Sequence, residues 1–132
     1  MSRTASVETA IAFVEKIWNS TDGLDRLDAW LTPSYRDHAY AEDREGLEKA
    51  LSELRAAFPD AWFEIEDAVG EADRAAVRLR LRATHTGPFR GNAPTNREID
   101  LKVFRWFRTV EGRIAEHWAL LDTTSLMRQL QS

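Results

Sequence analysis

The sequence predicts an α+β domain in which helices come first and an antiparallel sheet follows. Apolar residues recur with a helical period of about 3.6 up to residue 60, and with the strand period of two from residue 61 onward. The chain has 132 residues, which fits one domain (1–132), and no internal repeat or flexible linker divides it. This order predicts helices packed on one side of a strongly curved sheet.

The composition excludes several classes of protein. Hydrophobic residues make up 43% and charged residues 30%, which excludes a disordered chain. The absence of cysteine excludes disulfides, thiolate metal ligands and cysteine nucleophiles. The longest apolar run, residues 10–14, is too short for a membrane span or a signal-peptide core, so we expect a cytoplasmic protein. The net charge of −4 argues against a general nucleic-acid binder.

Two stretches of the N-terminal half carry the apolar stripe of an amphipathic helix. The first covers residues 7–18, and the second covers residues 44–58 and ends at Pro59, because proline cannot continue the hydrogen-bond ladder. A short apolar segment between them, residues 24–31, stops at Pro33.

The first predicted hairpin joins strands 61–69 and 75–85. Pairing them around the turn sets Glu66 opposite Arg78, and other acidic residues opposite the neighbouring arginines. We therefore interpret the arginine stripe as one side of a solvent-facing charge ladder and favour this over a nucleic-acid site.

The second predicted hairpin joins residues 98–108 to residues 113–122. An even-numbered loop pairs odd positions of the first strand with even positions of the second, and the more apolar of the two faces should point inward. That inner face also holds Arg105, Glu116 and Asp122, and buried ionised groups need a partner or a function.

Each of these polar residues has two interpretations. Arg105 either forms a salt bridge with Glu116 or anchors a substrate oxyanion or carboxylate. Asp122 either caps the C-terminal helix or acts as a general base whose pKa is raised by apolar surroundings, and its spacing alone favours the cap.

The three histidines are weaker candidates. His85 ends its strand facing inward at the rim, and His38 is a similar case; either could be structural or catalytic. The alternation points His117 outward, so it receives no catalytic role unless a bulge re-aims it. No histidine pair has a local metal-ligand spacing and no glycine loop has a nucleotide-binding spacing, so we expect no metal and no cofactor.

Several segments together resemble the SnoaL-like polyketide cyclases. Residues 84–97 read THTGPFRGNAPTNR, and residues 111–122 read EGRIAEHWALLD. Shorter pieces also fit: Trp18-Asn19, YRDHA at 35–39, LRAAFPD at 54–60 and LMRQL at 126–130. The resemblance spans nearly the whole chain and is specific for the family but not for one reaction.

The resemblance implies the NTF2-like fold, a bent sheet wrapped around helices to form a cone with a deep pocket. It also implies a homodimer through the outer sheet face, where Phe104, Trp106 and the outward-pointing His117 would lie. In this family an acidic residue at the end of the last long strand is the general acid/base, and Asp122 matches it. The implied reaction is a cofactor-free intramolecular aldol ring closure of a polyketide ester.

The expected site combines these interpretations. The apolar walls would be aromatic: Trp18, Tyr35, Phe89 and Trp118. Asp122 would be the base, His85 or His38 would assist, and Arg105 would orient an oxygen anion of a small apolar or anionic carbonyl compound. Because this fold hosts many functions, a non-catalytic ligand-binding module and a hydrolase or isomerase stay open. Arg105 and Ala119 depart from the residues common in the family, which leaves the substrate open.

Overall fold

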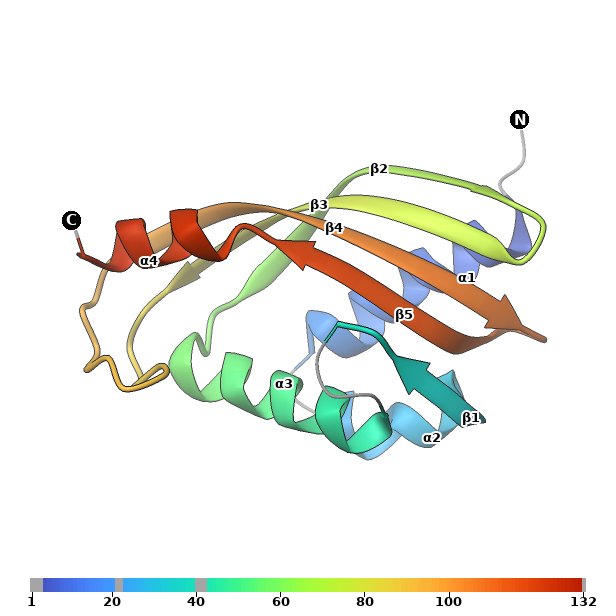
Figure 1. Ribbon diagram of the computed structural model, residues 1–132, viewed down its shortest axis with the longest axis horizontal. Coiled ribbons are helices and arrows are strands. Elements are labelled where there is room, and N and C mark those ends of the chain that lie inside the picture. The colour runs from blue at the N-terminus through green and yellow to red at the C-terminus, as the bar shows by residue number, and fades with distance from the viewer. Residues whose placement is uncertain (1–3, 21–22, 40–42, 132) are drawn as a thin grey trace.

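The computed structural model describes residues 4–20, 23–39 and 43–131, and within them five strands form one sheet with helices packed against it (Figure 1). The N-terminal helical elements are α1 (Ala5–Phe13), the π-helical turn η1 (Val14–Trp18), the 3-10 turn η2 (Gly23–Arg26), α2 (Leu27–Trp30) and α3 (Arg44–Ala57). The strands are β1 (Leu31–Asp37), β2 (Trp62–Glu71), β3 (Arg74–Thr84), β4 (Glu98–Val110) and β5 (Arg113–Leu121), and α4 (Thr123–Gln131) closes the chain.

The strand order is β1-β5-β4-β3-β2, which confirms the α+β prediction and adds one unexpected edge. Strands β2 to β5 form the predicted antiparallel meander, whereas β1 pairs with β5 in parallel, so the sheet is mixed. The sequence does not predict β1, because Pro33 interrupts it. Proline is tolerated here because β1 is an edge strand, where its missing N–H breaks no ladder.

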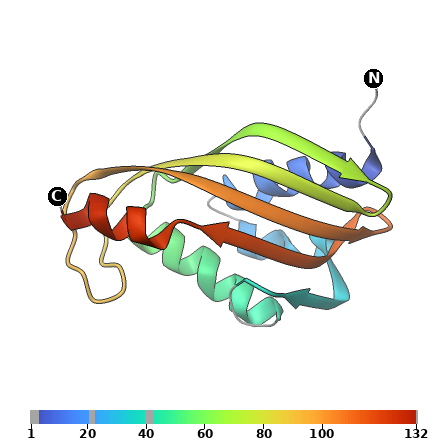
Figure 2. The same ribbon diagram turned by 45° about the horizontal axis from the view of Figure 1, so that its top comes forward.

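The N-terminal helices α1, α2 and α3 lie against one face of the sheet, as Figures 1 and 2 show from two directions. Asp43 caps α3 by accepting a hydrogen bond from the Gly46 N–H at 3.3 Å, and the helix ends just before Pro59, as predicted. In both views the loop between β3 and β4 reaches the C-terminal end of α3, where the N–H of Gly87 donates to the Ala57 carbonyl at 3.1 Å. Helix α3, the sheet and this loop therefore enclose a common interior.

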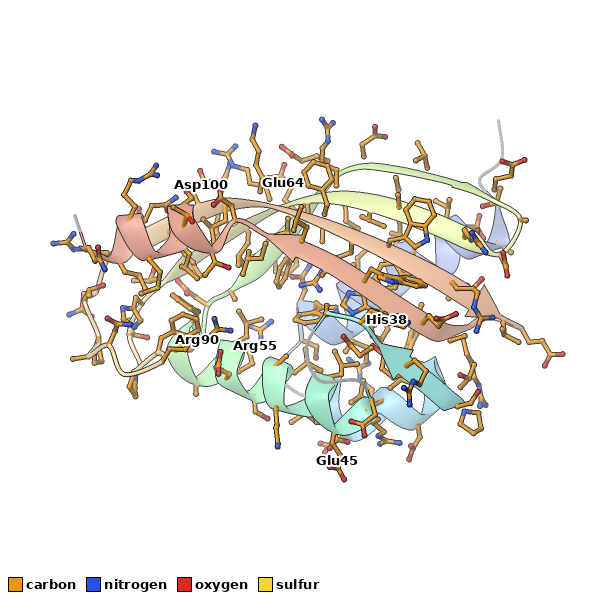
Figure 3. All side chains as sticks on the ribbon, viewed as in Figure 1. His38, Glu45, Arg55, Glu64, Arg90 and Asp100 are labelled. Atoms are coloured by element: carbon orange, nitrogen blue, oxygen red, sulfur yellow. The ribbon has the colours of Figure 1, made fainter. Side chains whose placement is uncertain are left out.

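A β-bulge in β2 changes part of the predicted charge ladder. Glu64 lies opposite Arg80, as predicted, but Glu66 is an extra residue, so Asp67 takes its place opposite Arg78. The ladder still exists on the outer face, where Arg80 donates from Nε to Oδ1 of Asp100 at 2.7 Å. Figure 3 shows Glu64 and Asp100 on the side of the sheet away from α3.

A second bulge, in β5, reverses the predicted direction of its side chains. Thr109 pairs with Ile114 and Arg108 pairs with Glu116, which leaves Ala115 as the extra residue. One additional residue moves every later side chain of a strand to the opposite face.

The predicted facing of the second hairpin is therefore wrong beyond this bulge. His117 points inward and is 0% exposed, whereas Glu116 and Trp118 lie on the outer face, where Trp118 is 37% exposed. An outer-face role for His117 in a subunit contact is excluded by this burial. Phe104 and Trp106 do lie on the outer face, as predicted.

No helix within the described ranges is both long enough and apolar enough to cross a bilayer.

Candidate functional site

A cavity of about 230 Å³ lies between α3 and the inner face of the sheet. Its walls are mainly apolar and include Leu54 and Phe58 of α3, Phe89 of the β3–β4 loop, and Leu101 and Val103 of β4. Pockets for drug-sized ligands span roughly 300–1,000 Å³, so this cavity suits a compact compound.

Arg105 places a positive charge at this cavity. It projects inward from β4, lines the cavity and is only 3% exposed. Its guanidinium carbon lies 3.8 Å from the centre of the Trp18 ring and 5.1 Å from that of Phe63, and both rings also line the cavity. Cation–π attraction to these two faces holds the charged group in a site removed from water.

Behind Arg105 a chain of buried polar groups runs to β1. Arg105 donates from its terminal nitrogen to Nε2 of His117 at 3.1 Å, and Nδ1 of His117 lies 3.1 Å from Oδ2 of Asp37. The Tyr35 hydroxyl donates to the same carboxylate oxygen at 2.5 Å. Because a guanidinium can only donate and a carboxylate accepts, His117 carries its proton on Nδ1.

The pKa values of both Asp37 and His117 are lowered in this row of buried polar groups. Burial alone would raise the pKa of Asp37, but the hydrogen bond and charge of His117, with Tyr35 and the Ala39 N–H, lower it to about 2. Burial lowers the pKa of His117 to about 4, helped by the Arg105 charge and opposed by Asp37. At neutral pH, Asp37 is therefore an anion and His117 is a neutral imidazole.

The predicted salt bridge between Arg105 and Glu116 is wrong. The β5 bulge carries Glu116 to the outer face, where it accepts from Nε of Arg108 at 2.5 Å and pairs with Nε2 of His38 at 2.8 Å. Arg105 is left on the inner face with His117.

His38 and Trp118 form a stacked pair outside the cavity. Their ring centres are 4.5 Å apart and their planes differ by 11°. His38 follows β1 and is 40% exposed, and Figure 3 shows it beside β1 and β5. The geometry therefore brings neither the predicted assistant His38 nor the predicted wall residue Trp118 to the cavity. Tyr35 also lies away from the cavity, behind Asp37.

His85 is buried behind the cavity wall. Its ring packs on Phe58 at 5.4 Å, and its Nδ1 accepts a hydrogen bond from the Thr95 N–H at 3.2 Å. The imidazole thus ties β3 to the loop that carries Phe89 into the cavity. Nε2 of His85 has no hydrogen-bond partner among the described residues.

Asp122 lies at the surface. Residue 122 is exposed, and its Oδ1 accepts from the Ser125 N–H at 2.9 Å, which confirms the helix-cap interpretation. The expectation that this carboxyl group is sequestered from solvent is wrong. Its neighbours Leu121 and Leu126 line the cavity, but Asp122 itself is not among the lining residues.

Sequence reasoning missed the two residues that support Arg105. His117 was expected on the outer face, and its inward direction depends on the single extra residue Ala115. Asp37 was overlooked because β1 was not predicted, although the alternating Tyr35 and Asp37 share one face of that strand. The tracts YRDHA (residues 35–39) and EHW (residues 116–118) are the sequence features that could have identified Asp37 and His117 as site residues.

The chain was compared with protein families and with curated proteins. Residues 8–130 match the family model of the SnoaL-like polyketide cyclases. No curated protein matches the chain significantly.

Solved structures from several bacteria are similar over nearly the whole chain. A protein of Jannaschia sp. CCS1, provisionally assigned as a SnoaL-like polyketide cyclase, has a TM-score of 0.88 and 22% identity, covers 100% of this chain and 98% of its own, and supports the fold alone. IdmH of Streptomyces antibioticus, provisionally assigned as a polyketide cyclase, has a TM-score of 0.83 and 29% identity over 96% of this chain and 99% of its own.

A third neighbour has a different provisional assignment. AclR of Streptomyces galilaeus, a provisional hydroxylase, has a TM-score of 0.86 and 26% identity over 98% of each chain. The fold is thus the NTF2-like cone, and because the family model covers nearly all of its residues, this chain belongs to the SnoaL-like polyketide cyclase family.

Proposed function

We propose that this chain is a cofactor-independent enzyme of the cyclase type, which removes a proton from the carbon beside a carbonyl group and closes a ring by aldol addition. The observation that carries the proposal is the position of Arg105, which lines the cavity and is bonded to His117, with Asp37 behind it. A cation that lines an apolar cavity, with a paired imidazole bonded behind it, is suited to forming an enolate.

Arg105 is the group that would bind the carbonyl oxygen. When the neighbouring carbon loses its proton, negative charge develops on this oxygen, and a guanidinium in a water-poor site stabilises it strongly. Because Trp18 and His117 already hold Arg105 in place, little reorganisation is needed when the charge appears.

His117 is the group that would accept the proton. Its Nε2 lone pair accepts an N–H of Arg105. A substrate carbonyl oxygen that takes this N–H would release the lone pair from Arg105 and bring the α-carbon, the one beside the carbonyl carbon, toward it. Asp37 would then stabilise the imidazolium that forms, as a carboxylate does in other His–Asp pairs.

The proposed reaction has three steps: proton removal, addition to a carbonyl group, and return of the proton. Nε2 of His117 takes the proton, and the electrons of the broken C–H bond form an enolate whose oxygen rests on Arg105. The enolate carbon attacks a second carbonyl of the same molecule, forming the new C–C bond. The imidazolium then returns its proton to the resulting alkoxide.

Asp122 is the second candidate for the acid/base role, because the family resemblance assigns it and because its neighbours Leu121 and Leu126 line the cavity. We place His117 first, since a base must lie near the oxygen that Arg105 binds. The alternative of a non-catalytic binding module predicts a retained ligand without any turnover.

Deuterium exchange tests the proposed function. The purified protein is incubated in D₂O with small cyclic ketones and 1,3-dicarbonyl compounds, and loss of the α-proton signal is followed by NMR. We expect exchange above background, reduced about 100-fold or more in His117→Gln, which is the scale of a lost general base. Arg82→Met, on the outer face, serves as the control. Absence of exchange in every compound that binds would exclude the enzyme and favour the binding module.

We also propose that a second copy of the chain covers the outer sheet face. The register places Trp106 opposite Trp118, and Phe104 opposite Leu120, so four large apolar side chains adjoin. They are between 37% and 72% exposed. A contiguous apolar patch on a sheet is typical of an interaction surface.

A further inference from the structure

The charges at the cavity are unevenly distributed. Among the described residues that line it, Lys49, Arg90 and Arg105 are cationic and Glu53 is anionic, which gives a local excess of two positive charges. The whole chain, in contrast, carries a net charge of −4. The remaining lining is mostly apolar.

We propose that the compound taken by this cavity is already an anion, a compact carboxylic acid whose carboxylate binds Arg105 and whose apolar body contacts the walls. The inference rests on the proposed function, because it names the substrate class of the same site. A carboxylate is the planar oxyanion that matches the fork of guanidinium N–H groups.

Burial makes Arg105 selective for such a charge. Arg105 is 3% exposed and its guanidinium lies over the Trp18 ring, so a bound carboxylate would interact with it where water screens little. A charge-assisted hydrogen bond in this setting is stronger than a bond to a neutral amide or ester. Arginine also keeps its charge at every physiological pH, so the preference would not be lost by titration.

The carboxylates of Asp37 and Glu53 oppose this binding only weakly. Asp37 is separated from Arg105 by the neutral ring of His117. Glu53 already pairs with Arg90, whose Nε lies 3.2 Å from Oε1 of Glu53. Figure 3 shows Arg90 on the loop beside the C-terminal end of α3, so this pair lies at the mouth.

A carboxylate on Arg105 also restricts which carbonyl compounds could lose a proton at this site. In a 3-oxo acid, the carboxylate and the ketone oxygen lie on either side of the acidic carbon. Both oxygens can face the one guanidinium of Arg105, which brings that carbon next to Nε2 of His117. A neutral methyl ester of the same acid lacks the charge that Arg105 binds.

Calorimetry with two unreactive probes tests the charge preference. The full chain is titrated at low salt with 2-naphthoate and with 2-naphthamide, which has nearly the same shape but no charge. We expect 2-naphthoate to bind at least about tenfold more tightly and to shift the NMR signal of the Trp18 indole N–H. Equal affinities, tighter binding of the amide, or binding of neither probe would overturn the inference.

Matched variants test whether Arg105 causes the preference for the carboxylate over the amide. Arg105→Met should bind the two probes about equally, whereas Arg82→Met removes the same charge from the outer face and should keep the wild-type ratio. If Arg105→Met does not fold, Arg105→Lys keeps the charge but not the planar fork, and the ratio should fall below that of the wild type. A wild-type ratio in either Arg105 variant would overturn the assignment.

The deuterium-exchange experiment separates this inference from the proposed function. Exchange of neutral ketones that depends on Arg105, together with equal affinity for the two probes, would leave the enzyme standing and overturn only the anionic substrate. Preferential binding of 2-naphthoate without exchange in any 3-oxo acid would support an anion-binding cavity and overturn the enzyme.

Discussion

Nδ1 of His117 lies 3.1 Å from Oδ2 of Asp37, and neither side chain is exposed to solvent. This contact joins β5 to β1, the two strands that pair in parallel, and the backbone register places the same two residues opposite one another. The pair therefore fastens the edge strand while it fixes the tautomer of the imidazole that faces Arg105.

Acid should weaken the fold in two separate pH windows. The pKa of His117 is about 4 in the folded chain and about 6.5 in the unfolded chain, so the unfolded state binds the proton more readily between these values. The neutral imidazole of His117 therefore contributes stability that is complete above pH 6.5. This contribution falls as the pH drops toward 4, by a total on the order of 3 kcal/mol. Asp37, with a pKa of about 2, adds a further loss only below about pH 3.8.

Urea unfolding at pH 7.5 and 4.5 measures the first window. The wild type should lose distinctly more free energy of unfolding between the two pH values than His117→Gln, in which no imidazole at this position titrates. Identical losses in the two proteins would show that His117 is not buried in its neutral form. Titrating groups that do not contact His117 contribute equally to both proteins and cancel in this comparison.

The sequence predicted those parts of the fold that depend on local periodicity. Helix α3, its end before Pro59 and the strands from residue 62 onward follow from spacing alone. The direction of the β5 side chains does not follow from spacing, because Ala115 looks like an ordinary strand residue. Only the pairing with β4 shows that it forms a bulge.

The candidate site was less predictable for the same reason. The parity of β4 correctly directed Arg105 inward, but its partners depend on tertiary pairing: Asp37 on an edge strand interrupted by Pro33, and His117 beyond the bulge. The Asp122 cap was visible from sequence, whereas its exposure required the position of α4.

Gly87→Ala should destabilise the chain and disturb the cavity. An added Cβ would lie 1.9 Å from the Ala56 carbonyl oxygen, so the loop would have to move away from the end of α3. Such overpacking destabilises by about 1–3 kcal/mol, and the movement would displace Phe89 from the cavity wall. Urea unfolding measures the first effect, and affinity for 2-naphthoate measures the second.

Gly91→Ala is the matched control for the same loop. A Cβ there meets nothing within 4 Å, and only its φ of +83° opposes the substitution, at roughly 1–2 kcal/mol. Affinity should be unchanged in Gly91→Ala and reduced in Gly87→Ala. Equal affinity in both variants would mean that the contact with α3 does not position Phe89.

Substitution in the outer apolar patch should abolish the proposed dimer. Leu120 is 72% exposed and Phe104, its cross-strand neighbour, is 51% exposed, so Leu120→Arg and Phe104→Arg place a charge in the centre of the patch. Sedimentation velocity should give a dimer for the wild type, at twice the mass of the 15.1 kDa chain, and a monomer for both variants.

Trp62→Arg provides the control for that experiment. Trp62 is 58% exposed on β2. Its register neighbour on β3, Arg82, lies opposite Asp100 of β4, which is not a patch residue. This variant should stay dimeric. A monomeric wild type at micromolar concentration, or a Trp62→Arg monomer, would contradict the assignment of the patch.

Two substitutions at Asp122 separate its structural role from a catalytic one. Asn and Asp are comparable helix caps, so Asp122→Asn should keep the free energy of unfolding, whereas Asp122→Ala loses the bond to the Ser125 N–H and should be destabilised by about 1 kcal/mol. Because the carboxyl group is exposed and His117 is the proposed base, deuterium exchange should remain within about threefold of the wild type in both variants. A fall of about 100-fold in Asp122→Asn, with folding intact, would return the acid/base role to Asp122. The same fall in His117→Gln but not in Asp122→Asn places the proton transfer at the buried end of the cavity, where Arg105 can hold the enolate oxygen.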